Sequence, residues 1–154
     1  MATGDRAFKI KYAASATPTE AVEMTDATQS ATMLHTSIDK SIGGGIEISC
    51  GSTAANVAYV DYTTTATATT TLNTALGGTI TGIDFLMIKI REAGSTGTPD
   101  VFLRLGSGDT SPQKLSGVGD VMLLRPSGWA GADYEIYSSG ATELAKVDIL
   151  YGKE

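Results

Sequence analysis

Few residues in this 154-residue chain are of a type that performs catalysis. His35 is the only histidine and Cys50 the only cysteine. A Ser-His-Asp triad needs a histidine with an orienting acid and a nucleophile within reach, whereas His35 lies in a polar segment. A metal site built from several histidines is excluded by their number, and Cys50 ends an alternating pattern that is typical of a small buried hydrophobic side chain. We therefore expect neither residue to act in catalysis.

The segment Asp109-Thr110-Ser111 is similar to the Asp-Thr-Gly/Ser signature of dimeric aspartic proteases, which are also small and all-β. In that family an apolar strand runs directly into the aspartate. Here Gly106-Ser107-Gly108 precede Asp109, which is typical of a surface turn. We expect the Asp109 carboxylate to accept hydrogen bonds from nearby backbone N–H groups.

Glycine-rich turns could hold ions or phosphates, but their spacing here does not fit either use. The sequences GSGD (106–109) and GVGD (117–120) resemble calcium-binding turns of β-roll proteins. Those repeats are short and come in tandem, whereas these occur once each. The triple glycine at 43–45 lacks the Gly-Lys-Ser/Thr of a phosphate-binding loop. The sequence therefore predicts no catalytic residue, no metal site and no cofactor.

The composition indicates a protein of low charge. Hydrophobic residues make up 42% of the chain and charged residues 18%, against about 25% charged in a typical soluble domain. The net charge of −6 disfavours nucleic-acid binding, and no apolar stretch approaches the ~20 residues that cross a membrane. The charged N-terminus, MATGDRAFKIKY, does not fit a signal peptide. We expect a protein made in a cytoplasm, with a surface suited to packing against copies of itself.

The longest apolar strand pattern lies at residues 80–91, ITGIDFLMIKIR. Successive side chains of a strand point to opposite faces. One face would carry Ile83, Phe85 and Met87, and the other Leu86, Ile88 and Ile90. A strand that is apolar on both faces lies either at the centre of a sandwich or with one face against another chain.

Other segments also show strand alternation, separated by Gly, Ser and Pro turns. Leu72 and Leu76 before Gly77-Gly78 predict a single helical turn with a glycine C-cap. No helical pattern extends over three turns. The sequence therefore predicts an all-β fold, an antiparallel β-sandwich or jelly roll with an extended N-terminal segment. The further strands are expected at residues 7–12, 46–50, 56–62, 101–105, 121–124, 134–137 and 144–151.

Residues 13–40 are polar and small, with short apolar islands. They fit either a loop with one short strand or an extended arm that becomes ordered when it lies across a neighbouring subunit. We expect residues 1–40 to form an N-terminal strand and arm and residues 41–154 to form the sandwich domain.

The pieces between Tyr62 and Gly152 follow a characteristic order. A Thr-rich stretch leads to a short Leu-Gly turn, and five strand-like pieces follow: FLMIK (85–89), VFLRL (101–105), VMLL (121–124) after a Gly-Asp turn (119–120), YEIY (134–137) and VDILY (147–151). This order resembles the small β-sandwich proteins that tailed bacteriophages carry on their virions, such as capsid decoration proteins and parts of head fibres and tails. The resemblance implies a structural virion protein that binds the major capsid protein or other virion proteins. It also implies a homo-oligomer, with a trimer favoured.

Six apolar or aromatic side chains are candidate partner contacts. Trp129, in the loop PSGWAGAD, fits either a tryptophan packed over the sandwich edge or an exposed platform for a sugar or protein. Two functions follow. The chain is expected to be a non-enzymatic capsid decoration protein, or alternatively a receptor- or glycan-binding module of a tail or head fibre. The candidate contacts are Phe85, Met87, Phe102, Trp129, Tyr134 and Tyr137.

Overall fold

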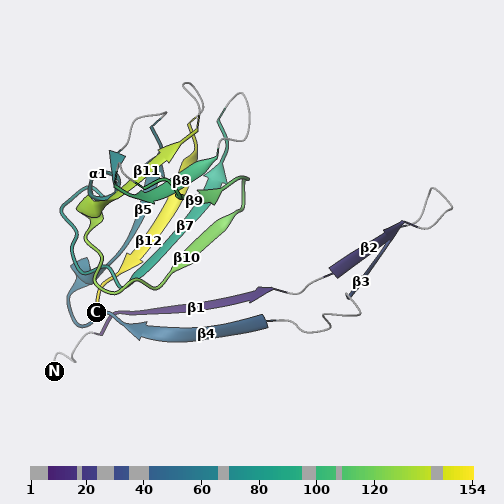
Figure 1. Ribbon diagram of the computed structural model, residues 1–154. Coiled ribbons are helices and arrows are strands. Elements are labelled where there is room, and N and C mark those ends of the chain that lie inside the picture. Colours follow the sequence, from purple (N-terminus) through teal and green to yellow (C-terminus); the bar gives the residue numbers. More distant parts are fainter. Residues whose placement is uncertain are drawn as a thin grey trace. The chain divides into compact units, whose positions relative to one another are not determined.

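The computed structural model describes residues 7–16, 19–23, 30–34, 42–65, 70–94, 100–106, 109–139 and 144–154 (Figure 1). The chain divides into two compact units. One comprises Met1–Lys9 and Ser49–Glu154, and the other comprises Ile10–Ile48. Strands dominate both units, and antiparallel sheets pack against each other in the larger one, which confirms the predicted all-β, sandwich-like fold.

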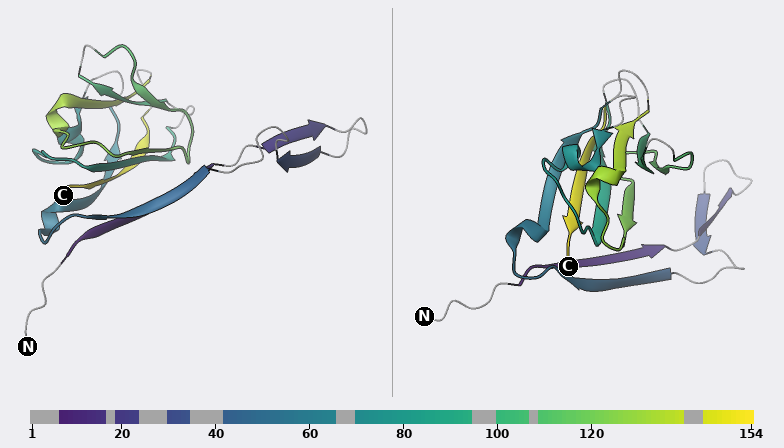
Figure 2. Two further views of the ribbon diagram at one scale, coloured as in Figure 1. Left: turned by 60° about the horizontal axis from the view of Figure 1, so that its bottom comes forward. Right: turned by 60° about the vertical axis from the view of Figure 1, so that its left-hand side comes forward.

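The larger unit is built from two four-stranded antiparallel sheets, which lie face to face as two layers (Figure 2). The first sheet has the order β10-β7-β12-β5 and the second the order β6-β11-β8-β9. The strands of the first sheet are β10 (Val121–Leu124), β7 (Phe85–Glu92), β12 (Lys146–Gly152) and β5 (Val57–Thr63). Those of the second sheet are β6 (Thr70–Thr71), β11 (Tyr134–Ser138), β8 (Val101–Leu105) and β9 (Gln113–Leu115).

The core lies between the two sheets and follows from the alternation of side chains. On β7 the residues Leu86, Ile88 and Ile90 are buried, and Val147 and Ile149 on the adjacent β12 are buried beside them. Burying one such aliphatic side chain stabilises the fold by about 1.5–3 kcal/mol. The segment forms an inner strand of its sheet, because β7 pairs with β10 on one side and with β12 on the other. The alternative that its outer face meets another chain stays a prediction.

The predicted helical turn is the single-turn helix α1 (Leu72–Ala75). Thr71 caps its N-terminus by accepting a hydrogen bond from the Thr74 N–H, and Gly77 follows with a φ of +76°, the left-handed conformation that ends helices. Leu72 is fully buried in the core. Two short 3-10 turns, η1 (Ala54–Asn56) and η2 (Gly131–Asp133), precede β5 and β11.

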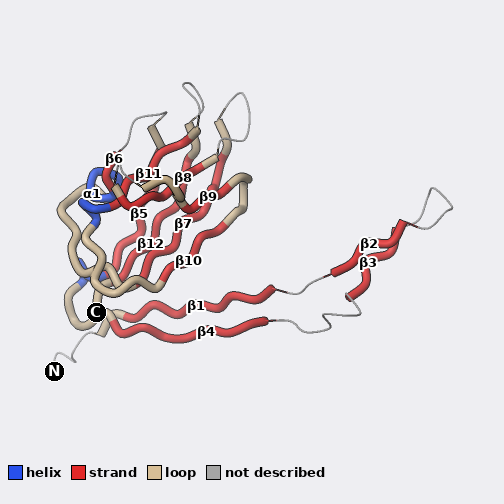
Figure 3. The backbone as a smooth tube through the Cα atoms, viewed as in Figure 1, coloured by secondary structure: helices blue, strands red, loops and turns tan. Residues whose placement is uncertain are grey.

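The smaller unit consists of two-stranded ribbons (Figure 3). β1 (Lys9–Ala16) pairs with β4 (Ile42–Ser49), and β2 (Thr19–Glu23) pairs antiparallel with β3 (Ser30–Leu34). Lys11 and Glu47 form an ion pair of 3.1 Å between β1 and β4. A side chain at Gly45 would begin 2.3 Å from the Tyr12 carbonyl oxygen, so the close approach of these strands requires glycine there.

Two predictions for the N-terminal region differ from the structure. The boundary expected after residue 40 assigned β4 to the sandwich, whereas β4 pairs with β1. Alternation along residues 46–50 predicts that Ile46 faces inward together with Ile48, but Ile46 is 52% exposed, because a two-stranded ribbon offers few buried positions. The region expected to be a loop with one strand, or an arm, contains both β2 and β3, and His35 lies outside the described residues.

Candidate functional site

The six predicted contact residues do not form one surface. Phe85 is fully buried, so its prediction as a partner contact is wrong. Strand parity places Phe85 on the same face of β7 as Met87, and the residue opposite it on β12 is Gly152, which has no side chain. An aromatic ring without exposed area offers nothing to a second protein.

Phe102 and Tyr137 lie side by side on the outer face of the second sheet. They are direct partners on β8 and β11, and their rings stack with centroids 5.2 Å apart. The Arg104 guanidinium lies 5.1 Å from the centre of the Tyr137 ring. Arg104 Nε also donates to Glu135 Oε2 at 2.6 Å, and this hydrogen bond raises the pKa of Arg104. The outer face thus combines two aromatic rings with a neutralised ion pair.

Trp129 and Tyr134 occupy a different place. Tyr134 and Tyr137 are three residues apart on one strand and therefore point to opposite faces. The Trp129 ring stacks on Tyr134 with centroids 3.9 Å apart and an angle of 17° between the planes. Two backbone hydrogen bonds of 2.9 Å join Trp129 to Ile83, which holds the loop beside the start of β7. Trp129 is half-buried against the core, as in the interpretation of a tryptophan packed over the sandwich edge.

The same tryptophan also lines a hollow of about 200 Å³. Tyr134 forms part of its wall, and burial raises the pKa of the Tyr134 phenol. The lining thus combines aromatic and aliphatic side chains with polar residues. The lining consists of Leu103, Arg104, Leu105, Asp109, Ser111, Gln113, Trp129 and Tyr134.

Asp109, in the lining of the hollow, behaves as the predicted turn residue. Its carboxylate accepts hydrogen bonds from the Leu105 N–H at 3.0 Å and the Ser111 N–H at 2.8 Å. These two backbone donors lower the pKa of Asp109. In the second glycine turn, Asp120 Oδ2 accepts in the same way from the N–H groups of Ser116 and Gly117. Both aspartates therefore hold turns together.

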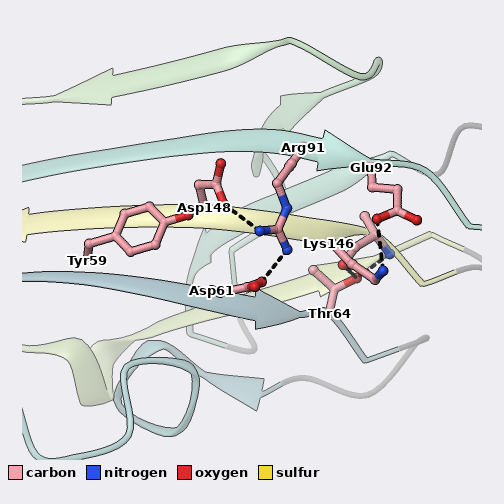
Figure 4. Close-up of polar contacts among 8 residues, drawn as sticks. Tyr59, Asp61, Thr64, Arg91, Glu92, Lys146 and Asp148 are labelled. Atoms are coloured by element: carbon pink, nitrogen blue, oxygen red, sulfur yellow. Dashed lines mark hydrogen bonds and ion pairs between the residues drawn. The ribbon is translucent and has the colours of Figure 1, made fainter.

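The outer face of the first sheet carries a network of polar side chains from β5, β7 and β12 (Figure 4). Arg91 lies between two carboxylates, 2.5 Å from Asp61 and 3.5 Å from Asp148. The Tyr59 hydroxyl donates to Asp148 Oδ1 at 2.6 Å. This hydrogen bond raises the pKa of Tyr59, and the one to Asp61 raises the pKa of Arg91. One guanidinium thus serves two carboxylates, and the Tyr59 hydroxyl adds a neutral donor to Asp148.

An apolar row crosses the same face next to this network. The strand registers place Leu123 beside Met87, Met87 beside Leu150, and Leu150 beside Tyr59. Tyr59 is 60% exposed, and the other three side chains are half-buried. Of the four residues in this row, Met87 alone was predicted from the sequence as a candidate partner contact. The other three residues were missed because their proximity depends on which strands are neighbours.

Several kinds of site find no support in the part of the chain that the structure describes. No group of three or more His, Cys, Asp or Glu side chains there could hold a metal ion. No helix among these residues is long and apolar enough to span a membrane. Cys50 is buried. Comparison of the chain with family models, curated proteins and solved structures finds no match.

Proposed function

We propose that this chain is a non-enzymatic structural protein of a tailed-phage virion, a capsid decoration protein that strengthens the shell through contacts between subunits. The observation that carries the proposal is the unit Ile10–Ile48, which is made of two-stranded ribbons. An isolated two-stranded ribbon is marginally stable in water and becomes stable when it packs on a further strand, sheet or helix.

The low burial of side chains in this unit also indicates that the ribbons require packing against a further surface. Among those that the structure describes, Ile10 and Ile48 are the buried hydrophobic ones. The rest of β1 is largely exposed. A ribbon that buries so little of its own surface is suited to lie against another subunit, where its apolar and backbone groups would be covered.

The sandwich provides a second argument for the proposal. Its main buried cluster is formed from residues between Leu72 and Tyr151. Its two outer faces carry aromatic and apolar side chains beside ion pairs, a composition suited to contact with protein. The proposed partners are the major capsid protein and further copies of the chain, in a virion. A stable contact of this kind buries more than about 1,000 Å².

Deletion of the ribbons tests the proposal. Phe8 and Cys50 are joined by a backbone hydrogen bond of 2.7 Å, so the ends of the ribbon unit meet. A short Asn-Gly turn between Lys9 and Ser49 can therefore replace residues 10–48. We expect the shortened protein to keep the circular dichroism of a folded sandwich but to lose binding to virions stripped of the protein.

The control is the full-length chain, which should rebind stripped virions and raise the temperature at which they rupture. Equal binding and protection by the shortened protein would contradict the role of the ribbons. Failure of the full-length chain to bind or protect the virions would contradict the decoration function itself.

The aromatic hollow supports a second candidate, a receptor- or glycan-binding module. Trp129 and Tyr134 provide a stacked aromatic wall, and Arg104, Ser111 and Gln113 provide polar groups near it. Sugar rings bind through such a combination of aromatic and hydrogen-bonding groups. Glycan-array binding that is lost in Trp129→Ala but kept in Phe102→Ala, on the outer face of the sheet, would support this function. The absence of any bound glycan would remove it.

A further inference from the structure

The four edges of the sandwich differ in length. β6 has two residues, β9 three and β10 four, whereas β5 has seven. Each lies at the end of its sheet. Edge strands carry unpaired backbone groups that can pair with another chain, and soluble proteins commonly shorten them for that reason. Among the described strands of the sandwich, β5 is the one long edge.

The backbone groups that face outward from β5 can be identified from its pairing with β12. Lys153 N–H donates to the Asn56 carbonyl at 2.9 Å, and Thr64 N–H donates to the Ala145 carbonyl at 2.8 Å. Antiparallel pairing alternates from residue to residue, so the even-numbered residues of β5 bond to β12. The N–H and C=O groups of Tyr59, Asp61 and Thr63 consequently point to the open edge.

This edge lacks the usual protection against pairing. The strand VAYVDYT contains no lysine and no proline. Its one charged residue, Asp61, forms an ion pair of 2.5 Å with Arg91, which also contacts Asp148. None of its seven residues is buried. The strand is therefore accessible, extended and rich in residues that favour sheets.

We propose that β5 pairs antiparallel with β5 of a second copy of this chain, which joins the two first sheets into one continuous sheet. A two-fold pair must bring the outward-facing odd residues opposite each other. The register centred on Val60 does so over the full strand, with Val57 opposite Thr63 and Tyr59 opposite Asp61. A register centred on Asp61 would place two carboxylates opposite each other, which is unfavourable.

The sequence of β5 itself favours a second copy of the chain as the partner of this edge. In the register centred on Val60 no like charges lie directly opposite, and each Asp61 faces a tyrosine. The apolar row of each copy ends at Tyr59, which would face Asp61 of the second copy across the two-fold axis. The dimer formed through β5 goes beyond the proposed function, because it depends on an edge of the sandwich and not on the ribbons. A trimer, as the resemblance implies, would need a separate contact.

Amide hydrogen exchange on the full-length protein tests the pairing residue by residue. The amides of Tyr59, Asp61 and Thr63 should exchange rapidly in dilute protein. They should slow by at least about tenfold at concentrations well above the dissociation constant of the pair. The amides of Val60 and Tyr62, already bonded to β12, should be protected at both concentrations. Concentration-independent, rapid exchange of the three odd amides would overturn the proposal.

A pair of substitutions at one position tests the register. Tyr59→Asp places two carboxylates opposite each other across the axis and should abolish the pair in sedimentation experiments. Tyr59→Lys places an ammonium opposite Asp61 and should retain it. Both variants lose the hydrogen bond from the Tyr59 hydroxyl to Asp148, so this loss cannot explain a difference between them. The fluorescence of Trp129 reports whether each variant remains folded.

Val121→Asp, at an exposed position on the short edge β10, is the control and should leave the pair unchanged. Equal association of Tyr59→Asp and Tyr59→Lys would overturn the proposed register. Loss of the pair in Val121→Asp would move the contact to the other edge and overturn the proposal.

Discussion

Replacement of Gly131 by alanine should destabilise the loop that carries Trp129. A Cβ atom at residue 131 would lie 2.4 Å from Asn73 Oδ1 and 3.3 Å from the Asn73 backbone nitrogen. Asn73 Oδ1 cannot move freely, because it accepts a hydrogen bond of 2.8 Å from the Ile80 N–H. Gly131 itself donates to the Ile80 carbonyl at 2.8 Å. The added methyl group therefore displaces a side chain that joins α1 to the segment before β7.

The size of the effect follows from the hydrogen bond that is lost. A buried or half-buried N–H left without a partner costs about 1–3 kcal/mol. For a domain of this length each kcal/mol lowers the melting temperature by about 2–4 °C. Gly131→Ala should thus melt several degrees below the wild type. Gly78→Ala is the control, because a Cβ there meets nothing within 4 Å, and its stability should change by less than about 1 kcal/mol.

Urea denaturation followed by the fluorescence of Trp129, the single tryptophan, measures these free energies. Asn73→Ala removes the obstructing amide and should cost about 1–3 kcal/mol by itself. In that background Gly131→Ala should cost little further, because the new methyl group fills the vacated space. Equal costs of Gly131→Ala with and without Asn73 would refute the reasoning, since residues that share one contact are not additive.

Three further outcomes are expected. Ile149→Ala, at a fully buried position between Ile88 and Val60, should cost about 2–5 kcal/mol, and a cost below about 1 kcal/mol in urea denaturation would contradict its place in the core. Asp109 has a lowered pKa in the folded state, so its contribution to stability is present above the unfolded pKa of about 3.9 and is lost as the pH falls through the folded value. The wild type should therefore lose more stability than Asp109→Asn between about pH 5 and pH 2, and parallel acid titrations of the two proteins would argue against the turn bonds. Tyr59 has a raised pKa, so its contribution is present below about pH 10 and is lost as the pH rises through the folded value. Tyr59→Phe should remove one late-titrating phenol from the ultraviolet spectrum. Removal of a phenol that titrates at the ordinary pKa of about 10 would contradict the bond to Asp148.

Local patterns in the sequence determined much of the secondary structure. The alternation at residues 101–105 and 121–124 predicted β8 and β10 with their observed bounds. Leu72 and Leu76 before Gly77 predicted the turn of α1. The bonds of Asp109 to backbone N–H groups followed from the glycine turn around it. These features depend on residues close together in the chain, so composition and spacing are sufficient to predict them.

The tertiary structure decided which strands are neighbours and therefore which side chains meet. It paired β4 with β1, buried Phe85 and left β5 at a sheet edge. The separation of Tyr137 from Tyr134, in contrast, follows from strand parity within the sequence. The polar network joins Arg91 to Asp61 across 30 positions of the chain and Tyr59 to Asp148 across 89. Such contacts depend on the pairing of strands that are distant in the sequence. Packing over the whole core decides that pairing, and no local sequence pattern encodes it.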